Sequence, residues 1–265
     1  MTPEEERVLL TDGELEVHGR ILPASNVTLI AEATLDGRSV QCVYKPVTGE
    51  RPLWDFPDGT LAHREVAAYL VSEALGWGLV PLTIERDGPL GRGMVQLWRE
   101  PAEEQDPVDI VPAGKVPEGY LRVLDASDGD GRPVMLVHEN SPVLHRMAVF
   151  DAVVNNADRK GGHVLAMPDG HRYGVDHGVC FHVEPKLRTV LWGWATLPLR
   201  DDEGEDLARL SEDLRSRDGA LRIALEGLLS RDEVRALRGR CDRLLAHGRM
   251  PLPSGEWPAI PWPAF

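Results

Sequence analysis

Alternating hydrophobic and polar positions mark four short runs in the first hundred residues, and this period-two pattern predicts β-strands. The first two runs flank Asp36-Gly37-Arg38, a turn sequence typical of a hairpin. The other two flank Arg86-Asp87-Gly88-Pro89, which also favours a turn. The predicted strands are residues 27–35, 40–45, 79–85 and 92–98.

A helical pattern separates the two strand pairs. Val66, Leu70 and Leu75 recur at the spacing of one helix face, and Asp58 or Thr60 is a suitable N-terminal cap. Glycines at positions 76 and 78 end the pattern. We therefore expect the order β-β-α-β-β over the first hundred residues.

The hydrophobic periodicity that predicts strands and helices weakens after residue 98. Residues 99–131 are rich in Pro, Glu, Asp and Gly, which predicts a connector or flexible insertion, with one short strand at 133–138. Ser141-Pro142 then opens a helix that has Met147 and Phe150 on one face.

The rest of the chain is predicted to be mainly helical. A small hairpin of residues 164–167 and 172–176 comes first, and the last helix begins with the capping box Ser230-Arg231-Asp232-Glu233. The tail, 251–265, is too apolar for a free segment, so we expect it to dock on the body. The predicted helices are 205–214, 220–229 and 230–247.

Charge and cysteine content narrow the class of protein. The formal net charge of −14 disfavours a chain that follows nucleic acid or lies on an anionic membrane, because both would repel it. Cys42, Cys180 and Cys241 are widely spaced, which predicts neither a disulfide framework nor a zinc cluster. No signal peptide and no transmembrane run is visible. We expect a soluble cytoplasmic protein with no nucleic-acid partner and no membrane-binding patch.

Two aspartates lie at turns on either side of the small hairpin. Asp158 follows Asn155 and Asn156 at the end of an apolar helix, where ordinary turn chemistry is the alternative explanation. Asp176 ends a strand, and a carboxylate there costs desolvation unless it meets a cation. Such a pair can present one carboxylate to an acceptor hydroxyl and the other to the magnesium on ATP.

Two further residues fit that chemistry. Lys45 ends a predicted strand and can neutralise phosphates, and Glu65, one turn inside the next helix, can hold it through an ion pair. Taken singly, each is also explained as a solvated surface residue. His163, five residues after Asp158, is the second candidate metal ligand by position.

A transition-metal hydrolase is an alternative interpretation of this segment. His171, His177 and His182 lie near His163 in the sequence, but the HxxxH and HExxH spacings that would make a site specific are absent. The phosphate loop GxxxxGK[ST], the dinucleotide motif GxGxxG and the nucleophile elbow GxSxG are absent too.

Four segments in register between about residues 27 and 181 resemble the phosphatidylinositol 3-/4-kinase superfamily, most closely its compact type II and bacterial HipA-like branches. That family has a catalytic loop Asp-Arg-His-x-x-Asn and a metal-binding turn Asp-Phe-Gly-x-x-Phe. The corresponding stretches here are Asp158–His163 and Asp176–Phe181. The four segments read VYKP (43–46), HREVAAYL (63–70), NADR (156–159) and VDHGVCF (175–181).

The resemblance implies an α+β, two-lobed protein-kinase-like fold with ATP between the lobes. The β-rich N-lobe would span 1–98, the mostly helical C-lobe 99–250, and the docked tail 251–265. Backbone groups of a hinge would meet the adenine edge, and a leucine would lie beneath the ring. The implied catalytic residues are Asp158 and Lys45, the nucleotide-binding residues Lys45, Glu65, Gln96, Leu97, Trp98 and Leu165, and the metal ligands Asp176 and His163.

The chain departs from the family pattern in three places. His163 stands where the family has an Asn ligand, and imidazole favours manganese or zinc more than an amide does. Lys160 stands where the family has its catalytic-loop His. Downstream of the metal turn, Lys186 and Arg188 are followed by VLWGW (190–194), which does not look like a site for an anionic lipid headgroup.

We therefore expect a kinase that uses ATP with Mg²⁺ or Mn²⁺ and transfers the γ-phosphoryl group to a hydroxyl of a protein or small molecule. A catalytically degenerate, nucleotide-binding scaffold is one alternative, motivated by His163 and Lys160. Adenylyl transfer on the same fold is another.

Overall fold

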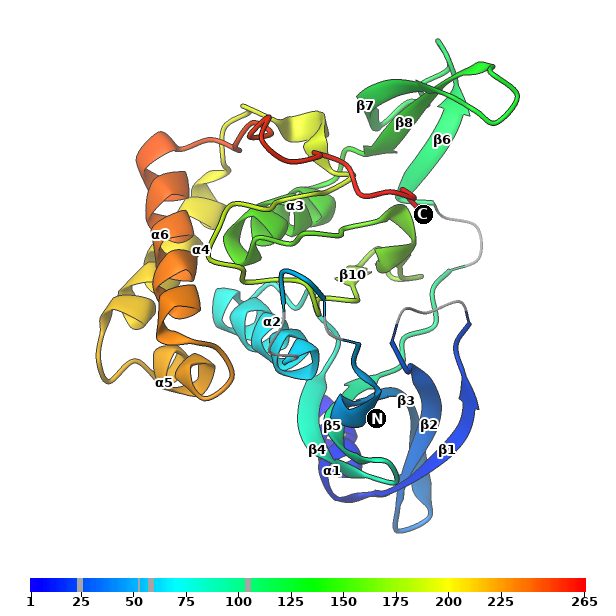
Figure 1. Cartoon of the computed structure of the whole chain (residues 1–265), viewed down its shortest axis with the longest axis vertical. Helices are drawn as coiled ribbons and strands as arrows, with labels where there is room; N and C mark the ends of the chain where they lie inside the picture. Colours follow the sequence, from blue (N-terminus) through cyan, green and yellow to red (C-terminus); the bar gives the residue numbers. More distant parts are fainter. Residues whose placement is uncertain (23–25, 52, 57–59, 103–105) are drawn as a thin grey trace.

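The computed structural model describes residues 1–22, 26–51, 53–56, 60–102 and 106–265, and Figure 1 shows a mixed α+β chain of antiparallel sheets and helices. The first hundred residues contain a five-stranded sheet in the order β1-β2-β3-β5-β4. The four strands expected from the alternation are present, although the one expected at 79–85 is observed at Thr83–Gly88. The strands are β1 (Glu14–Arg20), β2 (Leu29–Leu35), β3 (Arg38–Pro46), β4 (Thr83–Gly88) and β5 (Gly91–Leu97).

Two elements at the N-terminus were missed, so the expected order β-β-α-β-β was incomplete. Helix α1 (Pro3–Asp12) begins with a capping box, in which Thr2 Oγ1 accepts from the Glu5 amide at 3.2 Å and Glu5 Oε2 accepts from the Thr2 amide at 2.8 Å. Strand β1 follows it and pairs with β2. The sequence Thr-Pro-Glu-Glu carried the signal for this helix.

Helix α2 (Leu61–Leu75) lies between the sheet and the other helices (Figure 1). Thr60 is at its N-terminal cap but makes no side-chain cap bond; the Glu50 carboxylate instead accepts from the amides of Leu61 and Ala62, at 3.1 and 2.7 Å. The other expected cap, Asp58, lies outside the described residues. Gly76 ends the helix in the left-handed conformation, at φ 72°.

The expected connector at 99–131 is largely folded, which corrects the sequence analysis. Strands β6 (Val108–Pro112), β7 (Tyr120–Ser127) and β8 (Pro133–Glu139) form a three-stranded antiparallel sheet in the order β6-β8-β7. β7 is mostly half-buried or exposed, so its sequence lacked a clear hydrophobic face. In Figure 1 this sheet projects from one corner of the molecule.

The helical half of the chain surrounds a buried central helix, α3 (Pro142–Val154), of which Met147, Val149 and Phe150 are fully buried. The small hairpin β9 (Val164–Ala166) and β10 (Arg172–Gly174) follows it as expected. The last helix begins at the expected capping box of Ser230 and Glu233. The remaining helices are α4 (Asp201–Arg215), α5 (Ala220–Glu226) and α6 (Arg231–His247).

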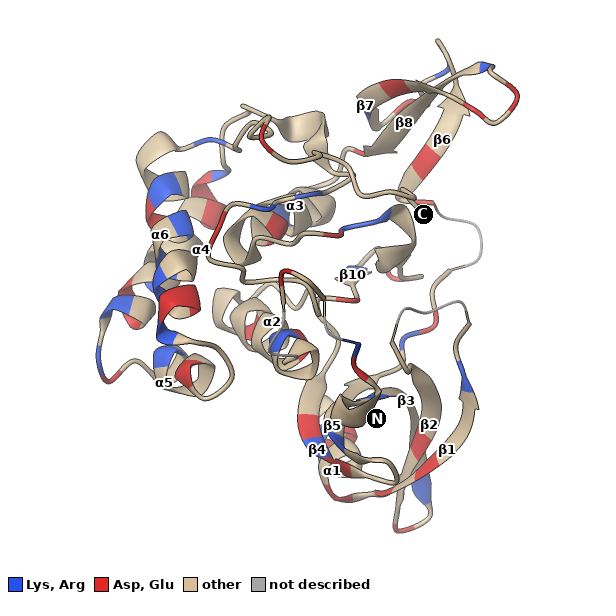
Figure 2. Cartoon of the chain, in the orientation of Figure 1, with Lys and Arg blue, Asp and Glu red and all other residues tan. Residues whose placement is uncertain are grey.

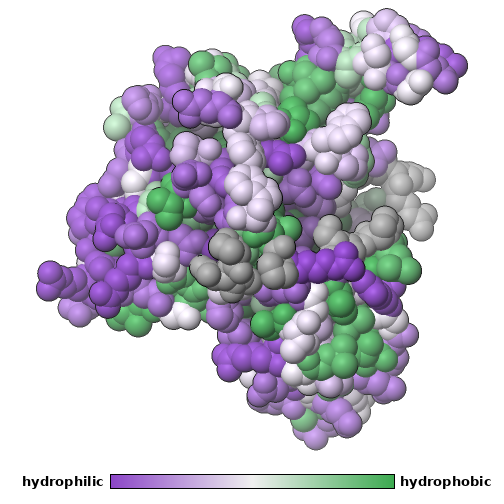
Figure 3. Space-filling view, in the orientation of Figure 1, coloured by the Kyte–Doolittle hydropathy of each residue, from purple (hydrophilic) through white to green (hydrophobic). Residues whose placement is uncertain are grey.

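No described helix is both long and apolar enough to cross a membrane. On the face drawn in Figure 3, hydrophilic residues cover most of the helical half, whereas hydrophobic residues gather over strands β1 to β3.

The tail at 251–265 lies against the body. The amide of Thr189 donates to Ala259 O at 3.0 Å, and the Gly161 amide donates to Ala264 O at 2.8 Å. A Cβ at position 161 would lie 2.3 Å from the Phe265 ring, so the ring packs directly on this glycine. The end of the chain therefore rests beside the loop that carries Asp158.

Candidate active site

The Lys45 ammonium lies between two carboxylates that come from distant parts of the chain. Its Nζ is 2.6 Å from Glu65 Oε1 and 2.8 Å from Asp176 Oδ1. Lys45 is on β3 and Glu65 is in α2, while Asp176 follows β10. Three residues that were selected from separate sequence segments therefore meet at one point.

Burial and neighbouring charges determine the protonation of Lys45 and of the carboxylates beside it. Burial lowers the pKa of Lys45, but Asp176 and Glu65 outweigh it, so the net pKa is raised. The nearby Lys45 ammonium holds the pKa of Asp176 below its usual range. Glu65 is 1% exposed, and its second oxygen accepts from the His177 amide at 2.8 Å. Lys45 therefore carries a positive charge, and Glu65 of helix α2 holds it in place.

Asp176 combines exposure with an unusual backbone. Its φ is 62°, in the left-handed region that few residues other than glycine occupy, and its side chain is half exposed. One carboxylate oxygen is taken by Lys45, while Oδ2 faces the His163 ring, 3.5 Å from Nε2. The strained turn therefore presents a carboxylate oxygen to the cavity described below.

Asp158 lies where α3 breaks into a tight loop. Asn155 ends the helix in the left-handed conformation, at φ 56°, and Asn156 Oδ1 accepts from the Asp158 amide at 2.9 Å. Burial raises the pKa of Asp158, although Lys160 opposes this from 3.6 Å. A carboxylate with a raised pKa is a better proton acceptor.

The His163 ring is oriented by the same loop. A short 3₁₀ turn (Gly161–His163) brings it back over Asp158, so that Nδ1 donates to the backbone oxygen of Asp158 at 3.1 Å. Because a carbonyl only accepts, the proton is on Nδ1 and Nε2 keeps its lone pair. Burial lowers the pKa of His163 to about 4, which keeps the ring neutral near pH 7. Histidine metal ligands are commonly oriented by such a backbone bond.

The donor set fits a hard divalent cation that is shared with phosphates. Asp176 Oδ2 and His163 Nε2 converge, and Mg²⁺ or Mn²⁺ held by few protein ligands takes its remaining ligands from phosphate and water. The described residues contain no group of three or more His, Cys, Asp or Glu that could hold a metal alone. Within the described residues, the alternative of a transition-metal hydrolase therefore has no cluster of protein ligands to support it.

The neighbouring histidines have other contacts. His171 Nε2 lies 2.9 Å from Gly78 O, and the His182 ring contacts Phe56 edge-on. His177 is fully buried, with Nε2 2.7 Å from Arg159 Nη2. The hydrogen bond and burial indicate a structural role for His177.

Arg159 holds the two aspartate turns together, a role that the sequence analysis missed. Its guanidinium is fully buried, pairs with Asp151 at 2.9 Å, and donates to the backbone oxygens of His163 and Val175 at 3.2 and 3.1 Å. A Cβ at Gly174 would lie 2.9 Å from Nη2, so β10 approaches the guanidinium closely. The NADR segment carried the signal, because an Arg between a buried helix and a turn needs a buried partner.

Four of the expected site residues border a cavity of about 280 Å³, whereas His163 is not among its described lining. Besides Lys45, Glu65, Asp158 and Asp176, its lining includes Arg188, which was not among the expected site residues. In the described part of the chain the Arg188 side chain has no hydrogen bond or ion pair, and its Nε is buried. An unpaired cation beside Asp158 is suited to a negatively charged ligand group.

Aromatic residues close the outer side of this cavity. The Lys186 ammonium lies 4.7 Å from the Trp54 ring centre and 5.0 Å from that of Trp257, and is 3.0 Å from Asp55 Oδ2. Trp257 belongs to the tail, so the tail forms part of the cavity wall.

The expected adenine contacts stay a prediction, and two of the backbone amides concerned already have partners. The amides of Leu97 and Trp98 already donate within the sheet, to Leu82 O and Gln41 O at 2.8 and 2.9 Å. The Gln96 side chain is buried and donates to Thr83 Oγ1 at 2.8 Å. Leu165 is half-buried in β9. None of these four expected residues is among the described lining of the 280 Å³ cavity.

One relative of known sequence accounts for nearly the whole chain. Protein Rv2133c of Mycobacterium tuberculosis is 55% identical over 271 residues, covering 99% of this chain and 96% of the relative. The chain matches no protein family model. At this identity and coverage, the chain belongs to the family of Mycobacterium tuberculosis protein Rv2133c.

Proposed function

We propose that this protein is an ATP- and divalent-metal-dependent phosphotransferase that transfers the γ-phosphoryl group to a hydroxyl of a protein or small molecule. The observation that carries the proposal is the position of Lys45 Nζ, 2.6 Å from Glu65 and 2.8 Å from Asp176. In protein kinases a lysine of the third strand pairs with a glutamate of the following helix, close to the metal-binding aspartate.

The proposal includes a two-lobed, kinase-like fold. It is supported by the order of the elements: Lys45 lies on the third strand of a five-stranded antiparallel sheet, and Glu65 lies in the helix between the third and fourth strands. Asp158 and Asp176 follow on the helical side, on either side of the β9–β10 hairpin. The lobes would be 1–98 and 99–250, with the tail 251–265 docked.

Each site residue has a distinct chemical role in the proposed reaction. Lys45 neutralises charge on the ATP phosphates, and Asp158 accepts the proton of the acceptor hydroxyl as its oxygen attacks the γ-phosphorus. The bond between the γ-phosphorus and the β–γ bridging oxygen breaks, and ADP leaves. Asp176 and His163 would hold Mg²⁺ or Mn²⁺, which neutralises charge on the phosphates.

The adenine edge would be met beyond β5 rather than by the amides of Leu97 and Trp98, since these are used in the sheet. Residues 99–102 leave the sheet at that point, and Leu165 lies on the neighbouring hairpin, where the Ala102 amide donates to Ala166 O at 2.8 Å. The hairpin is thus tied to the proposed hinge.

The alternatives are a degenerate nucleotide-binding scaffold and an adenylyl transferase on the same fold. Lys160 supports the first, because its ammonium lies 3.6 Å from the Asp158 carboxylate and competes for the proposed base. We favour an active phosphotransferase because Lys45, Glu65 and Asp176 are in direct contact.

The test is chromatographic analysis of the nucleotides formed from ATP with Mg²⁺ or Mn²⁺, together with a thermal-shift assay for binding. Wild type should form ADP, and Asp176→Asn should not. Asp169→Asn, an exposed aspartate in the β9–β10 turn, is the matched control and should behave as wild type. AMP as the product would indicate adenylyl or diphosphate transfer. Binding without turnover would favour the scaffold, and an absence of both would reject a nucleotide site.

A further inference from the structure

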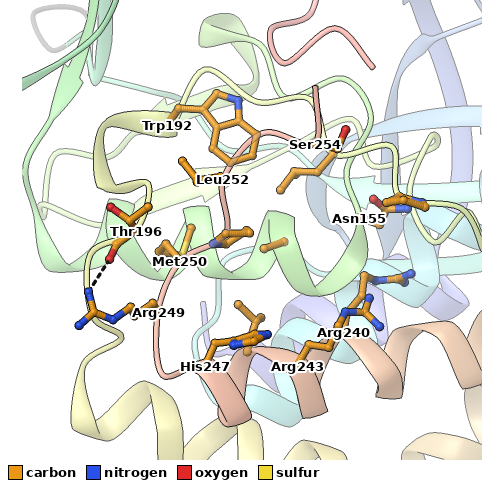
Figure 4. Close-up of a pocket in the computed structure, with 15 residues that line it drawn as sticks. Asn155, Trp192, Thr196, Arg240, Arg243, His247, Arg249, Met250, Leu252 and Ser254 are labelled. Atoms are coloured by element: carbon orange, nitrogen blue, oxygen red, sulfur yellow. Dashed lines mark hydrogen bonds between the residues drawn. The ribbon is translucent and has the colours of Figure 1, made fainter. Parts of the chain in front are cut away.

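A second and larger cavity, of about 510 Å³, lies on the helical side of the molecule (Figure 4). It is bordered by the last turns of α6, the start of the tail, and Trp192. A volume of this size is in the range of small-molecule sites. No role has been assigned to it in the proposed phosphotransfer.

The charge of this cavity is opposite to that of the protein. Arg240, Arg243, His247 and Arg249 line it, and none of its described lining residues is Asp or Glu. The whole chain carries a formal net charge of −14, and α6 displays several basic positions in Figure 2. A concentration of arginine without carboxylates is suited to an anion.

Arg240 provides an independent indication of an anion site. It is 7% exposed, and its guanidinium donates to two backbone oxygens, from Nε to Val153 at 2.7 Å and from Nη1 to His182 at 3.2 Å. Its Nη2 is buried with no hydrogen-bond partner among the described residues. Burial without a paired carboxylate lowers the pKa of Arg240 to about 10. An anion in the cavity, close to the Arg240 guanidinium, would offset this buried and unpaired charge.

The opposite side of the cavity is apolar. Leu187, Trp192 and Met250 contribute to its wall, and Leu252 covers it from the tail with 66% of its surface exposed. In Figure 4 Trp192 and Leu252 lie across the cavity from His247 and Arg243. A ligand that matches both sides needs a charged head and an apolar body.

This cavity is separate from the candidate active site. Residues 185–188 form a partition, in which Pro185 and Leu187 line the 510 Å³ cavity while Arg188 lines the 280 Å³ cavity. The neighbouring residues Leu187 and Arg188 thus face different cavities.

We propose that the 510 Å³ cavity is a binding site for an amphipathic anion, in which an anionic head group carried by an alkyl chain pairs with Arg240 and Arg243 while the chain packs on Leu187, Trp192 and Leu252. The site does not depend on the phosphotransferase proposal. The head group offsets the charge of Arg240 and Arg243 and the chain packs on the apolar wall, so neither part alone should bind well.

Isothermal titration with octyl phosphate tests this on the full-length chain. Wild type should bind one octyl phosphate saturably, whereas inorganic phosphate and 1-octanol at the same concentrations should not. Arg243→Ala should weaken binding roughly tenfold, the loss expected for a hydrogen bond to a charged group. The exposed Leu252→Glu variant, which places a carboxylate over the cavity, should abolish it. Arg235→Ala, an exposed arginine elsewhere on α6, is the matched control and should bind as wild type.

Four results would overturn the proposal of an amphipathic-anion site. Equal binding of inorganic phosphate would show a simple anion site, and equal binding of 1-octanol would show an apolar pocket in which charge has no role; either overturns the proposal. Equal affinity in wild type, Arg243→Ala and Leu252→Glu would place octyl phosphate elsewhere, and no binding by wild type would remove the site. Melting temperatures of the variants confirm that each is folded.

Discussion

The Arg159 guanidinium is fully buried against the Asp151 carboxylate, with Nη2 2.9 Å from Oδ1 and Nε 3.0 Å from Oδ2. Asp151 lies in the last turns of α3, and Arg159 lies in the loop beyond it. The same guanidinium reaches the backbone of His163 and Val175. One buried ion pair therefore fixes the loop of Asp158 relative to the turn of Asp176.

Removing the charge of Asp151 should destabilise the fold strongly. Asp151→Asn leaves a buried guanidinium without its counter-ion, and we expect a loss of about 3 to 5 kcal/mol in the free energy of unfolding, measured by urea denaturation. Asp232→Asn removes an exposed ion pair with Arg235 and should cost less than about 1 kcal/mol. Similar losses in the two variants would contradict a structural role for the buried pair.

Glu65→Gln should reduce ADP formation while leaving the protein folded. The glutamine oxygen can still accept from the His177 amide, but Lys45 loses the negative charge that positions it. We expect turnover to fall by about a hundredfold, as for misplacement of a catalytic group by about 1 Å. Glu73→Gln, an exposed position of the same helix, should retain activity. Unchanged steady-state turnover in Glu65→Gln would reject the proposed anchor.

His163→Asn should change the metal preference. Imidazole favours Mn²⁺ over Mg²⁺ more than an amide does, so the ratio of turnover with Mn²⁺ to turnover with Mg²⁺ should fall, on the order of tenfold. His171→Asn is the control, because His171 contacts Gly78 O instead. A ratio that is the same in His163→Asn and wild type would exclude His163 as a ligand.

His138 should make the protein less stable in mild acid. The Gly193 amide donates to its Nε2 at 3.0 Å, and its Nδ1 lies 2.9 Å from Glu139 O. Burial lowers the pKa of His138 from 6.5 to about 4, so the unfolded chain binds more protons than the folded chain between these values. Stability present above pH 6.5 is therefore lost as the pH falls, by about 1.4 kcal/mol per pH unit in this window.

Urea denaturation at pH 7.5 and 5.5 measures this effect. Wild type should lose about 1.4 kcal/mol more than His138→Gln over this interval, because the facing groups, Glu139 and His145, are the same in both proteins. Equal pH dependence in the two proteins would show that His138 does not contribute.

Local sequence patterns predicted most elements correctly, and the misses have local reasons. The capping box of Ser230 and Glu233 was predicted, whereas the equivalent box of Thr2 and Glu5 was missed. The strand predicted at 133–138 is confirmed as β8, whereas β6 and β7 fall in the predicted connector, because the partly exposed strand β7 has no clear hydrophobic face.

The sequence by itself determined which residue types were available at each turn. Periodicity and turn chemistry, which act over a few residues, place Lys45 at a strand end and Glu65 in the next helix. They also place Asp158 and Asp176 on either side of a hairpin. Only the tertiary structure brings the Lys45 ammonium into contact with both Glu65 and Asp176. It also buries Arg159 on Asp151 and leaves Arg188 unpaired within the described chain. The Lys45–Asp176 contact joins residues 131 positions apart. Even the Arg159–Asp151 pair, whose residues are 8 positions apart, depends on how the helix and the loop pack, which no local pattern specifies.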